Sequence, residues 1–281
     1  MKLLLLLILI VNYSFATTIY DIWSPEKDGE GWLVLAADGN VYDVSEELAR
    51  ELEIHLNEGS EISFNLSEQK SLKRKRVIGF QVLNTKQNLF PEDIPTPMDN
   101  YNPTVIDSMP RALEIFDTMR QRSRSRGQCF NRAYVWSYEM HKQFGVKSTK
   151  TWLFFTKKFI REYRYHWWFH VSPSISVKNE NDYILMDRKY MKTPVGIEEW
   201  KNYFMRNEPK CPVVSKYSDY RDHQEENYCY YMHSSMYFWQ PLQLENLESG
   251  RGDLKTEFNF SELKKAYRNG FGIWIRGGQW P

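Results

Sequence analysis

Alternating apolar and polar positions predict a small α+β unit between residues 31 and 84. The runs GWLVLA and VYDV, separated by the polar turn ADGN, are typical of a β-hairpin. In the segment SEELARELEIHLNEG, Leu48, Leu52 and Leu56 recur every four residues, which predicts a short helix that stops at Gly59. Two strand-like runs, EISFNLS and KRVIGFQVLN, follow, so these elements can form a compact barrel or a sheet covered by one helix.

A proline-rich stretch separates this unit from the rest of the chain. Proline lacks a backbone N–H and fixes φ, so prolines among Asn, Asp and Thr disfavour a helix or a central strand. The prolines concerned are Pro91, Pro95, Pro97, Pro103 and Pro110. We therefore expect a small α+β unit over residues 17–85, a linker over residues 86–110 and a larger α+β domain over residues 111–281.

A helix that starts at Cys129 is the clearest element of the larger domain. After Gly127, which suits a tight turn, apolar residues recur at helical spacing. They are Phe130, Ala133, Trp136, Met140 and Phe144. Another helix is expected before Arg120, and a final one over residues 261–269. The aromatic and β-branched runs YHWWFHVSPSISV and YILMDRKY, joined by a polar turn, predict a hairpin of two strands.

Residues 1–16 have the composition of a cleaved secretory signal peptide. Lys2 precedes an apolar run, and small residues end the segment at Ala16, after which we expect cleavage. The alternative, a membrane anchor, is disfavoured because nine consecutive apolar residues fall short of the roughly 20 that span a bilayer. The mature protein is then expected to be secreted or periplasmic, without a membrane partner.

The charge balance disfavours a nucleic-acid partner. The chain has 37 basic and 36 acidic residues, and loss of Lys2 with the signal peptide makes the two counts equal. Basic runs remain at residues 70–76 and 120–126, and either could be a nucleic-acid patch. Because export argues against that function, we expect solvated charge instead, which is accessible to a processing protease.

The three cysteines are informative because thiols in an oxidising compartment tend to pair. Cys211 and Cys229 lie 18 residues apart in a polar stretch, which favours a disulfide that closes a surface loop. Cys129 is then unpaired, either as a buried inert thiol or as a reactive one. The sequence has no Walker loop, dinucleotide-binding glycines or zinc-type Cys/His pairs, so we expect neither a cofactor nor a metal.

The position of Cys129 at a helix start favours the reactive alternative. There the positive end of the helix dipole and the unpaired backbone N–H groups favour thiolate over thiol. The same N–H groups can hold the oxyanion that forms when a thiolate attacks an amide carbonyl. Cys129 is therefore the candidate nucleophile.

His170 is the candidate base. Alternation places His166, Trp168, His170 and Ser172 on one face of the first strand of the expected hairpin. His166 borders the charged segment REYRY near the strand end, so we favour His170, although both could be ordinary strand histidines. Trp168, on the same face, either lines the substrate pocket or packs in the core.

Asp187 is the candidate third member of the site. Tyr183, Leu185 and Asp187 share one face of the next strand, where a carboxylate needs a hydrogen-bonded partner. An imidazole is such a partner, and the carboxylate would fix its tautomer and orientation. Asp182 is the alternative, but it lies in the turn and is expected to be solvated.

The segments GQCFNRA, WWFHVSPSISV and YILMDRKYMKTPVGIEEWKNYF resemble the bacterial protein-glutaminase family, which has Cys, His and Asp in matching contexts. The spacings, 41 residues from Cys129 to His170 and 17 from His170 to Asp187, also suit that family. The likeness covers most of residues 31–84 and extends from residue 120 to about residue 245.

This resemblance implies an α+β catalytic domain related to the transglutaminase and papain-like core, preceded by an inhibitory prodomain that proteolysis removes. It also implies that Cys129 attacks the side-chain amide of a protein-bound glutamine and that His170 supplies a proton to the departing ammonia. Water would then release glutamate from the thioester. The expected partners are proteins with exposed glutamine and the chain's own prodomain.

Two features depart from the family pattern. Arg188 follows Asp187 where the family usually has proline, so the carboxylate could pair with arginine instead of histidine. The family's catalytic domain is also richer in disulfides, and this chain carries an additional polar tail after Arg251.

Other functions could use the same residues. A transglutaminase would pass the acyl group to lysine, and a papain-like protease would cleave the main chain. An inactive binding or effector protein could keep the fold without the chemistry. The presence of Cys129, His170 and Asp187 together favours an enzyme.

Overall fold

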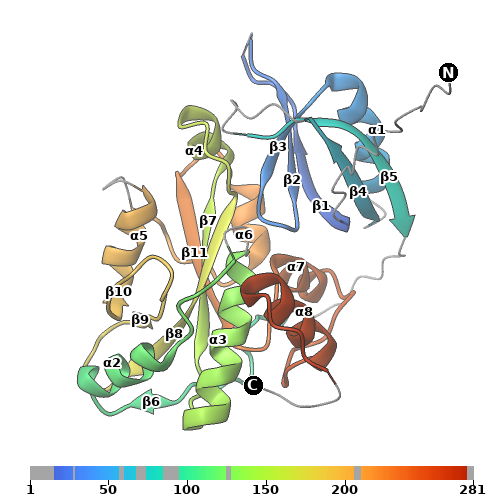
Figure 1. Cartoon of the computed structure of the whole chain (residues 1–281). Helices are drawn as coiled ribbons and strands as arrows, with labels where there is room; N and C mark the ends of the chain where they lie inside the picture. The colour runs from blue at the N-terminus through green and yellow to red at the C-terminus, as the bar shows by residue number, and fades with distance from the viewer. Residues whose placement is uncertain are drawn as a thin grey trace, which may run out of the picture. The chain divides into compact units, whose positions relative to one another are not determined.

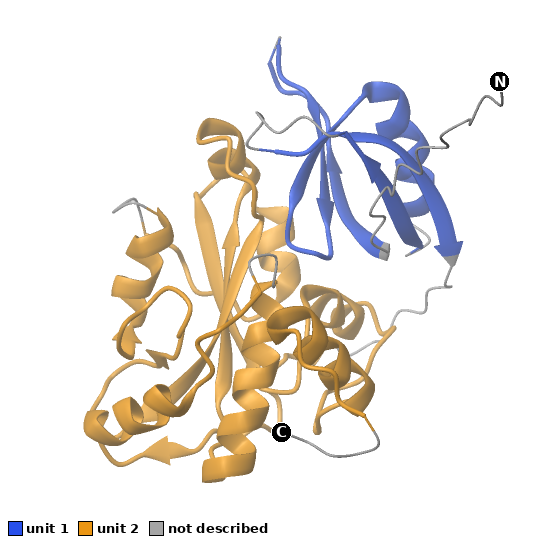
Figure 2. Cartoon of the chain, viewed as in Figure 1, with its two compact units in different colours: residues 1–87 blue, residues 88–281 orange. Residues whose placement is uncertain are grey.

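The computed structural model describes residues 16–27, 29–56, 60–67, 74–84, 95–124, 128–205 and 210–276. The chain forms two compact units, residues 1–87 (unit 1) and residues 88–281 (unit 2) (Figure 2). Nearly all of the expected signal peptide lies outside the described residues, as do residues 86–94 of the expected linker.

The described part of the proline-rich stretch belongs to unit 2. Residues Val105–Ile106 form strand β6, and helix α2 (Met109–Thr118) follows. Pro110 lies in the first turn of α2, where a missing N–H breaks no hydrogen bond. Regular structure therefore begins before the expected linker end at residue 110, because proline suits a helix start as well as a linker.

Unit 1, where it is described, is a five-stranded antiparallel sheet with one helix (Figure 1). Its elements are β1 (Ala16–Trp23), β2 (Trp32–Ala36), β3 (Val41–Val44), α1 (Glu46–Leu56), β4 (Glu61–Leu66) and β5 (Val77–Asn84). The strand order is β3-β2-β1-β4-β5. A bridge between Asp43 and Arg76, just before β5, brings the two edges together, so the sheet curls toward a barrel.

The hairpin β2–β3, the helix α1 and the strands β4 and β5 confirm the elements predicted for residues 31–84. Strand β1 was not predicted, although it lies in the middle of the sheet between β2 and β4. Its polar residues Thr17, Thr18 and Asp21 interrupt the apolar alternation, and it begins at the expected cleavage site.

Helix α1 contacts β1 and β2 through the apolar stripe that the sequence predicts. Leu52 is fully buried beside Val34 and Ile62, and Leu48 and Leu56 pack at the margin of the same cluster. Burial of a leucine side chain stabilises a fold by about 1.5–3 kcal/mol. Unit 1 therefore has a hydrophobic core of its own.

Unit 2 is built on a mostly antiparallel sheet with the strand order β10-β9-β8-β7-β11, to which β6 adds in parallel beside β8. Its other strands are β7 (Thr149–Phe155), β8 (Phe169–Val177), β9 (Ile184–Leu185), β10 (Val195–Gly196) and β11 (Cys229–Ser235). Its other helices are α3 (Cys129–Phe144), α4 (Lys157–Glu162), α5 (Ile197–Met205), α6 (Tyr217–Asp222), α7 (Pro241–Glu248) and α8 (Phe260–Phe271). The predicted α+β class is confirmed. Within the described residues no helix is long and apolar enough to cross a membrane.

Helix α3 contacts strand β8 along one side and helix α8 along another (Figure 1). Ala133 and Trp136, two of the residues that predict this helix, are buried. The helix ends at Gly145, whose φ of 69° is in the left-handed region that glycine adopts at little cost. Its predicted start at Cys129 is confirmed.

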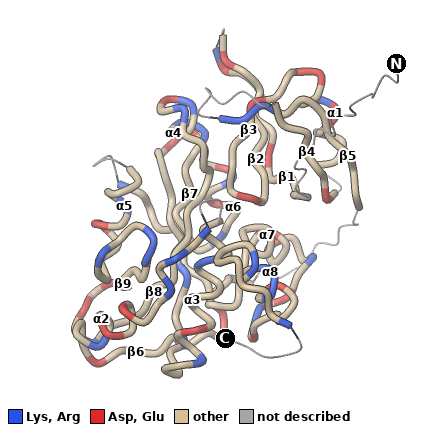
Figure 3. The backbone as a smooth tube through the Cα atoms, in the orientation of Figure 1, with Lys and Arg blue, Asp and Glu red and all other residues tan. Residues whose placement is uncertain are grey.

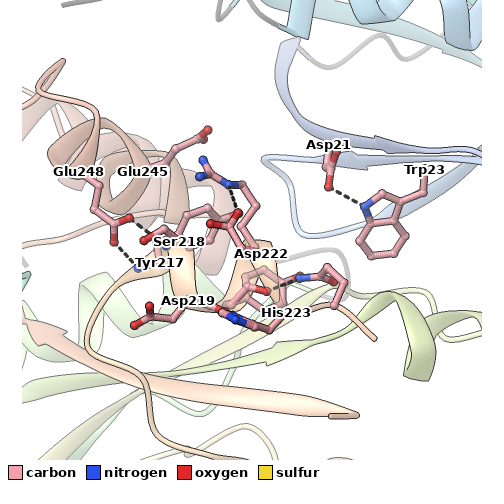
Figure 4. Close-up of polar contacts among 12 residues, drawn as sticks. Asp21, Trp23, Tyr217, Ser218, Asp219, Asp222, His223, Glu245 and Glu248 are labelled. Carbon is pink, nitrogen blue, oxygen red and sulfur yellow. Dashed lines mark hydrogen bonds and ion pairs between the residues drawn. The ribbon is translucent and has the colours of Figure 1, made fainter. Parts of the chain in front are cut away.

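A carboxylate from α7 forms hydrogen bonds with the start of α6. Glu248 of α7 accepts hydrogen bonds from the backbone N–H groups of Tyr217 and Ser218, the latter at 2.9 Å (Figure 4). Two N–H groups that the helix leaves unpaired are thereby satisfied, and the negative charge meets the positive end of α6.

The predicted disulfide between Cys211 and Cys229 is confirmed, and Cys129 is free. Cys229 begins β11, the last strand in the strand order of the sheet. The bridge therefore attaches the segment before α6 to this strand.

One residue of the second basic run forms an ion pair. Arg120, whose side chain is 35% exposed, donates to Glu139, whose side chain is 5% exposed, so this arginine is partly solvated and also paired.

Lysines and arginines are interspersed with aspartates and glutamates along both units (Figure 3). This distribution agrees with the near-zero net charge of the sequence.

Replacing both Cys211 and Cys229 with serine is expected to lower the free energy of unfolding of unit 2 by about 3 kcal/mol, because the open loop gains entropy in the unfolded chain. Urea titration followed by tryptophan fluorescence measures the loss. The parent protein under reducing conditions is the matched control and should unfold at the same urea concentration as the variant. Equal stability of the oxidised parent and the variant would contradict the prediction.

Candidate active site

Cys129 is the first residue of α3, and its side chain is partly exposed. Gln128 before it has extended backbone angles, φ −70° and ψ 146°, and its side-chain oxygen accepts a hydrogen bond of 2.7 Å from Asn131. The thiol therefore lies beside the unpaired N–H groups of the first helical turn. This is the position that the helical spacing of the sequence predicts.

The β8–β9 pairing brings His170 and Asp187 together. Ser174 of β8 lies opposite Leu185 of β9, and the antiparallel direction carries Asp187 back along β8 toward His170. The Nε2 atom of His170 is 2.7 Å from Oδ2 of Asp187, and both residues are 1% exposed. The two residues thus form a buried hydrogen-bonded pair.

Asp187 accepts two further hydrogen bonds. The indole N–H of Trp200 donates to Oδ2 at 2.9 Å, and the backbone N–H of Lys189 donates to Oδ1 at 3.3 Å. Burial alone would raise the pKa of Asp187, but the charge and hydrogen bond of His170, with Trp200 and the charge of Arg132, lower it overall. The carboxylate therefore stays ionised although water does not reach it.

The same pair favours the charged form of His170. Burial alone would lower the pKa of His170, but the charge and hydrogen bond of Asp187, and a hydrogen bond with Cys129, raise it overall. Because Nε2 bonds to Asp187, Nδ1 is the ring nitrogen that is left to interact with the Cys129 thiol. The ring thus connects a thiol on one side to a carboxylate on the other.

The two pKa shifts make the contribution of the pair to the stability of the fold depend on pH. The raised pKa of His170 means that its imidazolium stabilises the fold below the ordinary histidine pKa, and this contribution is lost as pH rises through the raised value. The lowered pKa of Asp187 acts in the opposite sense. Its contribution is present above the ordinary aspartate pKa and is lost as pH falls through the lowered value.

Aromatic rings enclose the imidazole. Phe204 lies 4.3 Å from it between ring centroids, Trp167 stacks on it at 6.1 Å, and Tyr190 meets it edge to face at 5.2 Å. Trp200 lies 5.5 Å away. These apolar faces lower the local dielectric, which strengthens the hydrogen bonds of the pair.

The structure places Trp168 in the core rather than in this aromatic shell. Its side chain is fully buried and its ring stacks on Phe154 and Tyr220. Trp168 precedes the first residue of β8, so the strand alternation that puts it beside His170 does not apply there. Trp167, which is partly exposed, is the tryptophan on the imidazole.

The two alternative residues are solvent-exposed: His166 precedes β8 and Asp182 lies in the turn before β9. Arg188 does not replace His170 as the partner of Asp187. Its guanidinium pairs with Asp117 at 3.4 Å and lies 4.6 Å above the Phe116 ring. The arginine that follows Asp187 therefore leaves the carboxylate to the histidine.

Sequence reasoning did not single out Arg132, Tyr190, Trp167, Trp200 or Phe204. Arg132 lies three residues after Cys129, so helical spacing could have placed it on the face of the nucleophile. Tyr190 lies in the turn between β9 and β10, and Trp200 lies in α5. Nothing in their spacing from Asp187 shows that their side chains face His170.

Within the described ranges, no group of three or more His, Cys, Asp or Glu could hold a metal ion.

Comparison with known proteins assigns this region. A family model described as glutaminase matches residues 113–204, a range that contains Cys129, His170 and Asp187. Residues 113–204 belong to the glutaminase family. The resemblance noted in the sequence is thereby confirmed for the segment that holds the site. No curated protein matches the sequence.

Two solved structures share the fold of this chain. The crystal structure of a pro-protein-glutaminase is 12% identical, with a TM-score of 0.52 over 91% of this chain and 92% of that one. A mutant of pro-protein-glutaminase is 14% identical, with a TM-score of 0.51 over 81% of this chain and 84% of that one. At these identities the likeness shows a shared fold.

Asp187→Asn is expected to lower the pKa of His170, because the neutral amide removes the charge that raises it. The ring signals of His170, followed by NMR from acid to alkaline pH, should titrate at lower pH than in the parent. Asp182→Asn, in the exposed turn, is the matched control and should leave the titration unchanged. Identical titration in Asp187→Asn and the parent would contradict the electrostatic coupling.

Trp200→Phe is expected to destabilise the fold by about 1–3 kcal/mol, because it removes a buried donor from the Asp187 carboxylate. Urea unfolding measures the loss. The same change made in the Asp187→Asn variant should cost less, since the bond is already weakened there. A cost that is equal in both backgrounds would show that the hydrogen bond contributes nothing.

Proposed function

We propose that this protein is a secreted protein-glutamine glutaminase that hydrolyses the side-chain amide of protein-bound glutamine to glutamate and ammonia. The observation that carries the proposal is the sequence of contacts from Cys129 through His170 to Asp187, inside the region that matches the glutaminase family. A nucleophile, a base and a group that orients the base are the parts that amide hydrolysis through a thioester needs.

In the proposed reaction the Cys129 thiolate attacks the carboxamide carbon of glutamine. The N–H groups at the start of α3 stabilise the negative oxygen that forms. His170, charged and held by Asp187, gives its proton to the departing amine, so that ammonia leaves and a thioester to Cys129 remains. The neutral imidazole then takes a proton from water, and the resulting hydroxide releases glutamate. Atoms and charge balance with water alone.

The buried pair suits both halves of this cycle. The raised pKa of His170 favours the imidazolium that the first half consumes, and the carboxylate of Asp187 stabilises that ion when the second half restores it. The aromatic shell covers the faces of the ring, so that proton transfer is directed to the side of Cys129, where the substrate and then the attacking water are placed.

Unit 1 is proposed to act as an inhibitory prodomain. Support comes from the shared fold with pro-protein-glutaminase, which covers 91% of this chain. The proline-rich segment near the boundary of the two units is the proposed place of proteolytic processing. The Cys211–Cys229 disulfide and the signal-like residues 1–16 support an extracellular or periplasmic site of action.

The test uses the full chain before and after limited proteolysis between the units, with a glutamine-containing protein as substrate. Ammonia release should rise after cleavage, and the substrate should show the mass gain of amide-to-acid conversion without backbone cleavage. Cys129→Ala should release no ammonia, whereas His170→Ala should lower kcat by about 10²–10⁴-fold, the range of general acid–base catalysis.

Different outcomes identify the competing functions. Incorporation of an added amine in place of amide-to-acid hydrolysis would indicate a transglutaminase, and fragments of the substrate would indicate a protease. Ammonia release by Cys129→Ala at the wild-type rate would refute the cysteine mechanism. Equal activity before and after cleavage would refute inhibition by unit 1, and an inactive protein in every processed form would favour a binding function.

A further inference from the structure

Tyr190 lies beside the His170–Asp187 pair but has no part in the reaction described above. Its backbone N–H donates to the carbonyl of Asp187 at 3.2 Å, so the turn that carries the carboxylate also carries this ring. The ring meets the imidazole edge to face, with centroids 5.2 Å apart and planes at 83°. Phe204 and Trp167 pack on it at 5.2 and 6.2 Å.

The hydroxyl of Tyr190 is available to a ligand. Among the residues that the structure describes, this hydroxyl forms no hydrogen bond, whereas those of Tyr134 and Tyr267 bond to the backbone of Asn259 and to Glu139. The Tyr190 side chain is only partly buried, and its oxygen is not sealed in the core. A ring fixed by packing, with an unbonded hydroxyl on a side chain that is only partly buried, suits recognition of a polar group.

Burial keeps the Tyr190 phenol protonated. Burial raises the pKa of Tyr190 to about 12; Arg132 opposes this shift, and Cys129 and Asp187 add to it. The Arg132 guanidinium lies 5.9 Å from the centre of the Tyr190 ring. The phenol is therefore protonated at neutral pH and can donate a hydrogen bond, and the nearby positive charge strengthens it as a donor.

We propose that Tyr190 is a catalytic residue whose hydroxyl donates a hydrogen bond to the carboxamide oxygen of the substrate glutamine. The proposal rests on the function proposed above, since the bound group is the one that Cys129 attacks. It adds a side-chain donor to the backbone N–H groups of α3, so that the developing oxyanion is held by two elements of the fold.

The donor acts without transferring its proton. As the bond between Cys129 Sγ and the amide carbon forms, the electron pair of the C=O bond moves onto the oxygen, and the Tyr190 hydrogen bond shortens. When that pair returns, the C–N bond breaks and ammonia leaves with the proton from His170. Tyr190 is unchanged at the end of the step.

Tyr190→Phe tests the proposal, because it keeps the ring packing and removes only the hydroxyl. In the processed protein we expect kcat for ammonia release to fall about 100-fold, with little change in KM, as for loss of one oxyanion donor. Alkylation of Cys129 by iodoacetamide has no oxyanion to stabilise, so its rate and pH profile should match those of the parent.

Tyr203→Phe is the matched control. Its ring lies 5.7 Å from that of Tyr190, and Tyr203 is 56% exposed, so kcat should stay within about twofold of the parent. Wild-type kcat in Tyr190→Phe would overturn the proposal while leaving the proposed glutaminase intact. Parallel losses of kcat and alkylation rate would also overturn it, by showing that the hydroxyl positions the pair. Absence of ammonia release from the parent would refute both.

Discussion

The hydrogen bond between His170 and Asp187 joins two groups that are each 1% exposed. An isolated carboxylate at such a position would cost several kcal/mol, because no water solvates its charge. The structure offsets that cost with donors from three places: the imidazole of β8, the indole of Trp200 on α5 and the backbone N–H of Lys189. The site therefore exists only when β8, the turn after β9 and α5 are all in place.

This constraint explains features that otherwise look separate. The short strand β9 has only Ile184 and Leu185, yet its register with β8 decides where Asp187 lies. Helix α5 follows β10 at once and brings Trp200 and Phe204 to the pair. Arg188 turns to Asp117 and the Phe116 ring, so this arginine does not compete with His170 for the carboxylate. Each element contributes to one buried electrostatic arrangement.

Cys129 differs from its partners because it remains partly exposed. A nucleophile must reach substrate, whereas the groups that tune the imidazole work better without water. The helix start supplies this difference in exposure. It keeps the thiol at the end of α3, while the body of the helix, through residues such as Ala133 and Trp136, is buried in the core. The same helix carries Arg132, whose charge acts on Asp187 and Tyr190.

The sequence by itself determined the α+β class, the helix that starts at Cys129, the hairpin whose first strand carries His170, and the Cys211–Cys229 bridge, whereas Asp187 lies just after the strand that was expected to hold it. These depend on local periodicity, turn residues and cysteine number, which are readable without coordinates. Only the tertiary structure decided that Trp167 rather than Trp168 stacks on the imidazole, that β1 lies in the middle of unit 1, and that Arg132, Tyr190 and Trp200 surround the pair. Those outcomes depend on strand register and on which side chains distant elements bring together, and no local pattern encodes either.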